Sequence, residues 1–126
     1  MNPSGLAYLG DAFYELSVRR RLMERGEAYK ADMLHLAAVR YVKAASQAKA
    51  MRTLVKQGLL SDEELDVMRK ARNRKPKTIP KNSDPLEYKT ATAFEALLGY
   101  HYFEGRADRA EELAALAMSA IDEGSQ

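Results

Sequence analysis

The sequence predicts an all-α fold, and three observations point to it. Residues that favour helices, namely Ala, Leu, Glu, Lys, Arg and Met, are abundant along the chain. Apolar residues recur at spacings of three and four, while no stretch alternates polar and apolar residues between hairpin turns. The 126 residues, 46% hydrophobic and 30% charged, suit one globular core, so we expect residues 1–126 to form a single domain.

Two helices are expected in the first half of the chain. The first runs from Gly5 to Arg25 and is followed by Gly26, a residue type that commonly ends helices. The second covers residues 30–57, as one helix or as two, and ends before Gly58. The apolar stripe of the first helix is predicted to consist of Leu6, Leu9, Phe13 and Leu16.

A third helix follows, and a loop comes after it. Ser61 and Glu64 form a capping box, in which the serine side chain caps the helix and the glutamate reaches back, so a helix is expected to begin here and to end near Asn73. Residues 74–83 contain two prolines and lack apolar periodicity. They are therefore expected to form an exposed loop.

Two further helices complete the expected bundle. Asp84 has the side chain of an N-cap, and Pro85 suits the first helical position, so the fourth helix is expected to start here and to run to Phe103. Asp108 and Glu111 have the spacing of a capping box and are expected to start the fifth helix. The prediction is thus five helices without a β-strand.

Composition excludes several classes of protein. The chain has no cysteine, so it carries neither disulfides nor a thiolate metal site, and zinc is not expected. No apolar run approaches the roughly 20 residues that span a bilayer, and the N-terminus lacks the layout of a secretory signal. We therefore expect a cytoplasmic protein that does not enter a membrane.

The positive charge is concentrated in one segment, residues 69–81, which we call the basic arm. It contains seven basic residues and no acidic one, leaving 13 basic and 18 acidic residues elsewhere. Closely spaced Lys and Arg residues suit a nucleic-acid backbone, although such a run can also be a solvated loop without a partner. The basic residues of the arm are Arg69, Lys70, Arg72, Arg74, Lys75, Lys77 and Lys81.

Glu95 is a carboxylate in an unusual position on the fourth expected helix. At about 100° per residue it falls in the same sector as Ala91, Leu98 and Tyr102, beside an otherwise apolar stripe. A glutamate inside the stripe must be paired or bound to a metal ion, whereas one at its edge extends to water. The sequence pattern alone leaves both interpretations open.

Asp11 and Glu15 lie one turn apart on the first helix and share a face with Tyr8, nearly opposite the apolar stripe. Their mutual repulsion is a local cost that a hard cation such as Mg²⁺, which takes oxygen ligands, can offset. The alternative is a solvated polar face. His35 and His101 are isolated and belong to no catalytic triad, so both are expected to be structural or surface residues.

Two motifs resemble those of the ribonuclease III family. LAYLGDAFYEL, residues 6–16, resembles the family signature, in which an LGDA core carries the catalytic aspartate, here Asp11. TAFEALLG, residues 92–99, resembles the second acidic motif and carries Glu95. Together with ARN at residues 71–73 and PKNSD at residues 80–84, they identify the Mini-III branch, a catalytic domain without the double-stranded-RNA-binding domain. The resemblance covers essentially the whole chain.

The sequence departs from the larger enzymes of this family at two positions. Ala7 stands where they carry a glutamate four residues before the signature aspartate, and Thr92 stands where they carry an aspartate. Both residues are similar to those of the Mini-III branch. Because two carboxylate ligands are missing, a fully ligated two-metal site cannot be carried over. Asp11 and Glu95 match the motifs directly, and Glu15 is a weaker candidate.

The resemblance implies a function. It implies a ribonuclease III catalytic-domain-like bundle that forms a two-fold homodimer with Tyr8 at the interface. It implies that Asp11 and Glu95, with Glu15 as a further candidate ligand, hold Mg²⁺ or Mn²⁺ and that the enzyme cuts double-stranded RNA. The expected substrate is a precursor of large-subunit (23S) ribosomal RNA, with a ribosomal protein as a candidate helper. The basic arm is expected to grip duplex RNA by its shape, phosphates and 2′-hydroxyls.

Two rival functions are compatible with the composition. One is a catalytically silent helical protein that binds RNA or assists ribosome assembly, and the retention of Asp11 and Glu95 argues against it. The other is a structural bundle whose basic loop docks onto an acidic protein, which would leave the motif matches as coincidences. A comparison of binding to duplex RNA with binding to an acidic polypeptide separates the structural bundle from the nuclease and from the silent RNA-binding protein.

Overall fold

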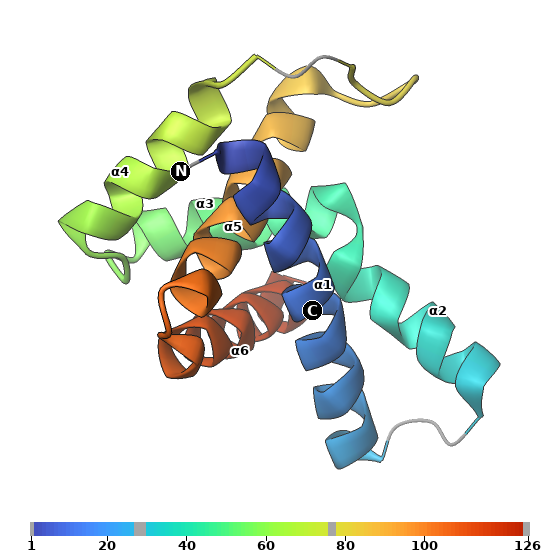
Figure 1. Ribbon diagram of the computed structural model, residues 1–126. Helices are drawn as coiled ribbons and strands as arrows, with labels where there is room; N and C mark the ends of the chain where they lie inside the picture. The colour runs from blue at the N-terminus through green and yellow to red at the C-terminus, as the bar shows by residue number, and fades with distance from the viewer. Residues whose placement is uncertain (1, 27–29, 76–77, 125–126) are drawn as a thin grey trace.

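The protein is all-helical, as the sequence predicts. The computed structural model describes residues 2–26, 30–75 and 78–124, and within these ranges the chain forms helices and no β-strand (Figure 1). The helices are α1 (Pro3–Arg25), α2 (Ala31–Val42), α3 (Ala44–Lys56), α4 (Asp62–Asn73), α5 (Pro85–Phe103) and α6 (Ala107–Gly124).

Helix α5 is the centre of the bundle. It packs against α1, α3, α4 and α6, whereas α2 packs on α1 and α3 and projects away from the other helices (Figure 1). The fully buried side chains include Tyr14 and Val18 of α1, Phe94 and Leu97 of α5, and Leu113 of α6. The core is thus built around one helix, and that helix carries Glu95.

The predicted second helix is two helices. Lys43 has extended backbone angles (φ −65°, ψ 149°), which end α2 at Val42 and start α3 at Ala44. No glycine or proline marks this break in the sequence. Side chains replace the lost helical hydrogen bonds, because the Tyr14 hydroxyl donates to the Tyr41 carbonyl oxygen at 3.2 Å.

The buried face of α1 differs from the predicted stripe. Leu6 is buried, but Leu9 and Phe13 are only half-buried and Leu16 is 67% exposed. The helix instead turns its small residues toward α5, because these allow the two backbones to approach closely. The buried residues of α1 are Leu6, Ala7, Gly10, Tyr14, Ser17, Val18 and Leu22.

Two glycines allow α1 and α5 to touch through their backbones. A Cβ atom on Gly10 would overlap the carbonyl oxygen of Glu95, and a Cβ atom on Gly99 would overlap the carbonyl oxygen of Leu6. Any larger residue at either position would force the helices apart. The same two glycines belong to the LGDA and EALLG motifs, so this contact places the two acidic motifs side by side.

A buried ionic cluster fixes α4 to α5 and α6. The capping box of Ser61 and Glu64 is present as predicted, and the Glu64 carboxylate, 2% exposed, also contacts His101 Nε2 at 2.6 Å and Arg109 Nη2 at 2.8 Å. Burial alone would raise the pKa of Glu64, but the hydrogen bonds from Arg109, the Ser61 backbone and His101 lower it to about 2. His101 therefore has a structural role.

The starts of the last two helices were predicted with unequal success. The Asp84 side chain accepts from the Leu86 backbone N–H at 3.0 Å, so the predicted N-cap of α5 is confirmed. Helix α6 begins at Ala107, which puts Asp108 inside its first turn, so the capping box predicted at Asp108 was wrong. Glu111 instead accepts a hydrogen bond from the Ser17 hydroxyl at 3.1 Å.

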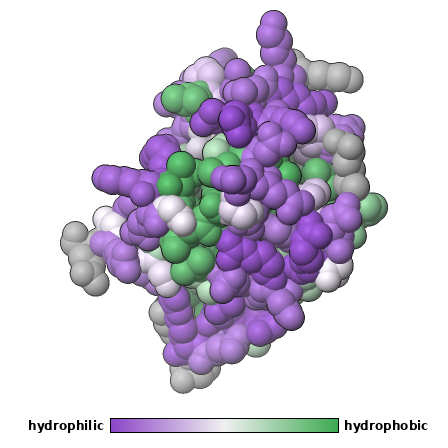
Figure 2. All heavy atoms as spheres, turned by 90° about the vertical axis from the view of Figure 1, so that its left-hand side faces the viewer, coloured by the Kyte–Doolittle hydropathy of each residue, from purple (hydrophilic) through white to green (hydrophobic). Residues whose placement is uncertain are grey.

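The surface on the α4 side is mostly hydrophilic, with a hydrophobic patch near its centre (Figure 2). Within the described residues, no helix is both long enough and apolar enough to cross a membrane.

Gly10→Ala should destabilise the protein by about 3 kcal/mol, because the added methyl group meets the backbone of α5 rather than a movable side chain. Urea unfolding followed by circular dichroism measures this change. Gly5→Ala is the matched control, since its Cβ atom meets nothing within 4 Å and alanine favours helix. Equal stabilities of the two variants would contradict the close approach at Gly10.

Candidate active site

Asp11 and Glu95 lie on one cavity. Its volume is 610 Å³, and it is bounded by α1, by α5 and by the loop that follows α4. The Gly10 contact explains the arrangement, because Asp11 follows the glycine directly and Glu95 supplies the carbonyl oxygen that the glycine approaches. The cavity is lined by Asn2, Ser4, Ala7, Tyr8, Asp11, Arg74, Thr78, Tyr88, Thr92 and Glu95.

The environment of Glu95 disfavours its charged form. Burial, together with the hydrogen bond and the charge of Asp11, raises the pKa of Glu95 to about 8, although Gln47 acts in the opposite direction. The Glu95 side chain itself is half-buried, so it is neither enclosed in the core nor fully exposed to water. Its polar neighbours are Asp11 and Gln47, so the structure combines features of the two interpretations that the sequence left open.

Glu15 does not join the two acids as a third neighbour. Its carboxylate forms an ion pair with Arg19 at 3.2 Å, and its side chain is 39% exposed. Among the residues that the structure describes, no group of three acidic, histidine or cysteine side chains is arranged to hold a metal ion. The structure thus brings Asp11 and Glu95 together, and Glu15 contributes only its charge to the electrostatics of Glu95.

The donor set fits a hydrated divalent cation. Mg²⁺ is commonly bound by one or two carboxylates while it keeps several waters, and the cavity has room for such an ion. Burial and the neighbouring Asp11 both raise the pKa of Glu95, and a cation between the two acids would offset both effects. Ala7 and Thr92 line the cavity without adding a carboxylate, and the Thr92 hydroxyl donates to the Tyr88 carbonyl oxygen at 2.9 Å.

The basic arm is divided between a helix and a loop. Arg69, Lys70 and Arg72 belong to the last turns of α4, where Lys70 pairs with Asp66 at 3.1 Å and Arg69 approaches the same carboxylate at 3.9 Å. Arg74 ends the helix, and the remaining described residues of the arm follow it. Lys75 and Lys81 are exposed. Lys77 lies outside the described residues.

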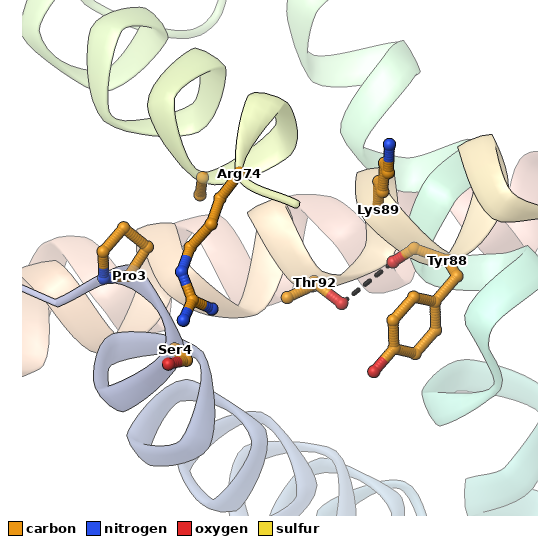
Figure 3. Close-up of a pocket in the computed structure, with 7 residues that line it drawn as sticks. Pro3, Ser4, Arg74, Tyr88, Lys89 and Thr92 are labelled. Atoms are coloured by element: carbon orange, nitrogen blue, oxygen red, sulfur yellow. Dashed lines mark hydrogen bonds between the residues drawn. The ribbon is translucent and has the colours of Figure 1, made fainter. Parts of the chain in front are cut away.

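Arg74 is the described basic residue of the arm that lines the cavity. Arg74 also lines a second pocket, which shares Ser4, Tyr88 and Thr92 with the cavity; the close-up of that pocket in Figure 3 shows the Arg74 side chain extending from the end of α4 toward Ser4 of α1. Within the described part of the chain, its guanidinium forms no hydrogen bond or ion pair. Its charge is therefore available to a ligand of the cavity.

Tyr8 is 84% exposed and lines the edge of the same cavity. Leu16 and Met23, also on α1, are 67% and 66% exposed. Tyr8, Leu16 and Met23 are thus three exposed apolar side chains of α1, with the Glu15–Arg19 ion pair among them. Of these three residues, only Leu16 was assigned to the core by the sequence pattern, and that assignment was wrong.

Sequence reasoning missed Gln47 and Tyr88. Tyr88 lines the cavity, and Gln47 Nε2 lies 3.4 Å from Glu95 Oε2 although the two residues are 48 positions apart in the chain. A glutamine in a helical segment has no pattern that predicts such a contact. Predicting the contact of Gln47 with Glu95 would have required knowing that the helix breaks at Lys43, because the break determines which way α3 runs.

Glu95→Gln should stabilise the metal-free protein at alkaline pH. The folded pKa of Glu95, about 8, exceeds its ordinary value of 4.5, so the stability present below pH 4.5 is lost as the pH rises through 8. A neutral glutamine avoids this loss. In EDTA at pH 8.5 we expect the variant to be more stable by at least about 1 kcal/mol, or roughly 4 °C in Tm.

Thermal unfolding at pH 5 and pH 8.5 measures the effect, and the advantage of the variant should largely vanish at the lower pH. Glu123→Gln, a change at an exposed residue, is the control and should leave the pH dependence unaltered. An advantage of Glu95→Gln that is the same at both pH values would rule out the raised pKa.

Known proteins resemble this chain over most of its length. The family model of the ribonuclease III domain matches residues 4–106. A Mini-ribonuclease 3 of Symbiobacterium thermophilum is 47% identical over 97% of this chain and 92% of its own, and one of Brevibacillus brevis is 43% identical over 96% and 88%. A crystal structure of a protein from Fusobacterium nucleatum matches with a TM-score of 0.80 at 26% identity, over 94% of this chain and 92% of that one.

The matched region contains both acidic motifs and the helices that hold Asp11 against Glu95. The chain belongs to the ribonuclease III family of endoribonucleases, in its Mini-ribonuclease 3 branch.

Proposed function

We propose that this protein is a metal-dependent endoribonuclease that cleaves double-stranded RNA as a two-fold homodimer. The observation that carries the proposal is the pairing of Asp11 with Glu95 in a 610 Å³ cavity that Arg74 also lines. Two acids with one raised pKa suit a cation, and an available guanidinium suits a phosphate. Membership of the ribonuclease III family supports the same reaction.

Asp11 and Glu95 would hold Mg²⁺ or Mn²⁺. When bound, such an ion supplies an activated water for in-line attack on a backbone phosphate and stabilises the leaving 3′-oxygen. The protein contributes the fixed geometry of the two carboxylates, which the Gly10 contact sets. It also contributes Arg74, whose planar guanidinium can bind two phosphate oxygens at once. Glu15 has its own partner in Arg19 and is the weaker candidate ligand.

The basic arm would grip the RNA duplex. Its loop residues, including Lys75 and Lys81, are exposed, and Arg74 joins the arm to the site. A-form RNA has a deep, narrow major groove that side chains do not read, so contacts go to phosphates, 2′-hydroxyls and the overall shape. Weak sequence preference is the expected consequence.

The exposed apolar side chains of α1, namely Tyr8, Leu16 and Met23, would contribute to the dimer contact. A 250 Å³ groove next to it is lined by side chains of α1 and α2, including Met23 and Leu34. Helix α2 adds exposed Met33 and other apolar side chains. Large exposed apolar side chains on two neighbouring helices favour an interaction site, and a two-fold dimer covers the same surface on both copies.

The narrower proposal concerns the natural substrate. The resemblance of both acidic motifs to the Mini-III branch favours precursors of 23S ribosomal RNA in the cytoplasm, with a ribosomal protein that presents the RNA as a candidate helper. The name of the relatives, Mini-ribonuclease 3, supports RNA as the class of substrate.

Asp11→Asn should lower the cleavage of a labelled RNA duplex in Mg²⁺ by at least about a hundredfold, because it removes a ligand charge that contributes several kcal/mol to transition-state stabilisation. EDTA should abolish cleavage by the wild-type protein. Gel analysis of the products measures both effects. Glu123→Gln, an exposed change far from the motifs in sequence, should cleave normally. Duplex binding without cleavage by folded wild-type protein would favour the silent RNA-binding alternative.

Neutralising the arm should weaken duplex binding and flatten its salt dependence. Removing one phosphate contact should reduce the slope of log Kobs against log salt by about 1. The test variant changes Arg72, Arg74, Lys75 and Lys77 to glutamine. The control variant changes four exposed basic residues outside the arm to glutamine, namely Arg20, Lys30, Lys43 and Lys56. Equal slopes for the two variants, measured by fluorescence anisotropy, would exclude a specific role for the arm.

Leu16→Glu should convert the dimer to a monomer, because it places a charge in the centre of the proposed apolar contact. Size-exclusion chromatography with light scattering measures the mass directly. Leu86→Glu changes a leucine of similar exposure, 65%, on α5 and should leave the dimer intact. A wild-type protein that is monomeric at micromolar concentration would contradict the proposed assembly.

A further inference from the structure

Gln47 is a buried polar residue that the proposed mechanism does not use. It lies in the first turn of α3, and it is 3% exposed. Burying an amide costs free energy unless its polar atoms find partners, so the partners of Gln47 indicate why it is there.

The break between α2 and α3 determines where the amide of Gln47 lies. Because α2 ends at Val42, its last carbonyl groups lack helical donors, and side chains supply them. Gln47 Nε2 donates to the Val42 carbonyl oxygen at 2.7 Å. The neighbouring Ser46 hydroxyl donates to the Arg40 carbonyl oxygen at 2.6 Å. The amide of Gln47 is thus anchored on the main chain.

The same nitrogen faces Glu95. Gln47 Nε2 lies 3.4 Å from Glu95 Oε2, which is long for a hydrogen bond. Such a weak contact contributes little binding energy but can restrict the direction of the carboxylate. Among the described residues, no other amide or basic side chain donates a hydrogen bond to Glu95. The Oε1 atom of Gln47 is buried and has no partner within the described ranges.

We infer that Gln47 is a positioning residue for Glu95. Its amide, anchored on the Val42 carbonyl group, holds the Glu95 carboxylate in the orientation that ligates a divalent cation beside Asp11. Partners of metal ligands commonly change metal affinity or activity by about 10- to 100-fold when they are removed. The inference rests on the proposed function, because it needs Glu95 to be a metal ligand.

The rival explanation is that Gln47 only caps the end of α2. Ser46→Ala is a matched control for that role, since it removes another side-chain donor from the same break without touching Glu95. Gln47→Met keeps a similar volume and loses both hydrogen bonds of the amide. Both variants should lose comparable thermal stability, because each leaves one carbonyl group of the break without its donor.

The decisive readout is Mn²⁺ binding in the absence of RNA, measured by isothermal titration calorimetry. Gln47→Met should bind the ion at least about 10-fold more weakly than wild type, whereas Ser46→Ala should bind it as wild type does. The Mg²⁺ concentration that gives half-maximal cleavage should rise in the same order. Gln47→Asn, which keeps an amide one methylene shorter, should show the same weakening and provides a second variant if Gln47→Met does not fold.

The outcomes distinguish the role of Gln47 from the proposed function. Mn²⁺ binding by a folded Gln47 variant that equals binding by Ser46→Ala would overturn the positioning role and leave the proposed function standing. Failure of the wild-type protein to bind Mn²⁺ at all would overturn the proposed function, and the role of Gln47 with it. Weakened binding that is confined to the Gln47 variants supports both.

Discussion

The backbone contact between α1 and α5 is the constraint on which the rest of the structure depends. It requires Gly10 and Gly99, because a side chain at either position would overlap the main chain of the other helix. Asp11 is adjacent to the first glycine, and Glu95 lies one turn before the second. The packing contact and the pairing of the acids are therefore one arrangement. A change that separates the helices also separates the carboxylates.

Local signals predicted most of the fold because they act over a few residues. The capping box at Ser61 and the N-cap at Asp84 were confirmed, since each depends on a hydrogen bond within three positions. Leu16 was misassigned because apolar periodicity identifies an apolar face without telling what covers it. The break at Lys43 was not located because side chains distant in sequence, such as Tyr14, satisfy its carbonyl groups.

The acids of the site were predictable from motifs, whereas their electrostatics was not. Asp11 and Glu95 stand in the two segments that resemble the ribonuclease III motifs, so their proximity could be expected. Gln47 and Arg74 reach the same region from α3 and from the end of α4, and no spacing rule relates them to the acids. Glu15 and Arg19 have the i, i+4 spacing of a helical ion pair, and the structure contains that pair. The same carboxylate was also a candidate metal ligand, and the sequence does not decide between the two roles.

The pKa values of two glutamates, the buried Glu64 and the half-buried Glu95, are shifted in opposite directions. Arg109 and His101 keep Glu64 ionised down to about pH 2, so its stabilising effect is lost only in acid. Glu95 favours the neutral form up to about pH 8, so its cost grows as the solution becomes alkaline. Considering these two groups alone, the metal-free fold is most stable near pH 4.5, whereas an ionised Glu95 requires alkaline conditions. Any cation that binds between Asp11 and Glu95 would lower the cost of ionising Glu95 at neutral pH, so ion binding and the stability of the fold would be linked.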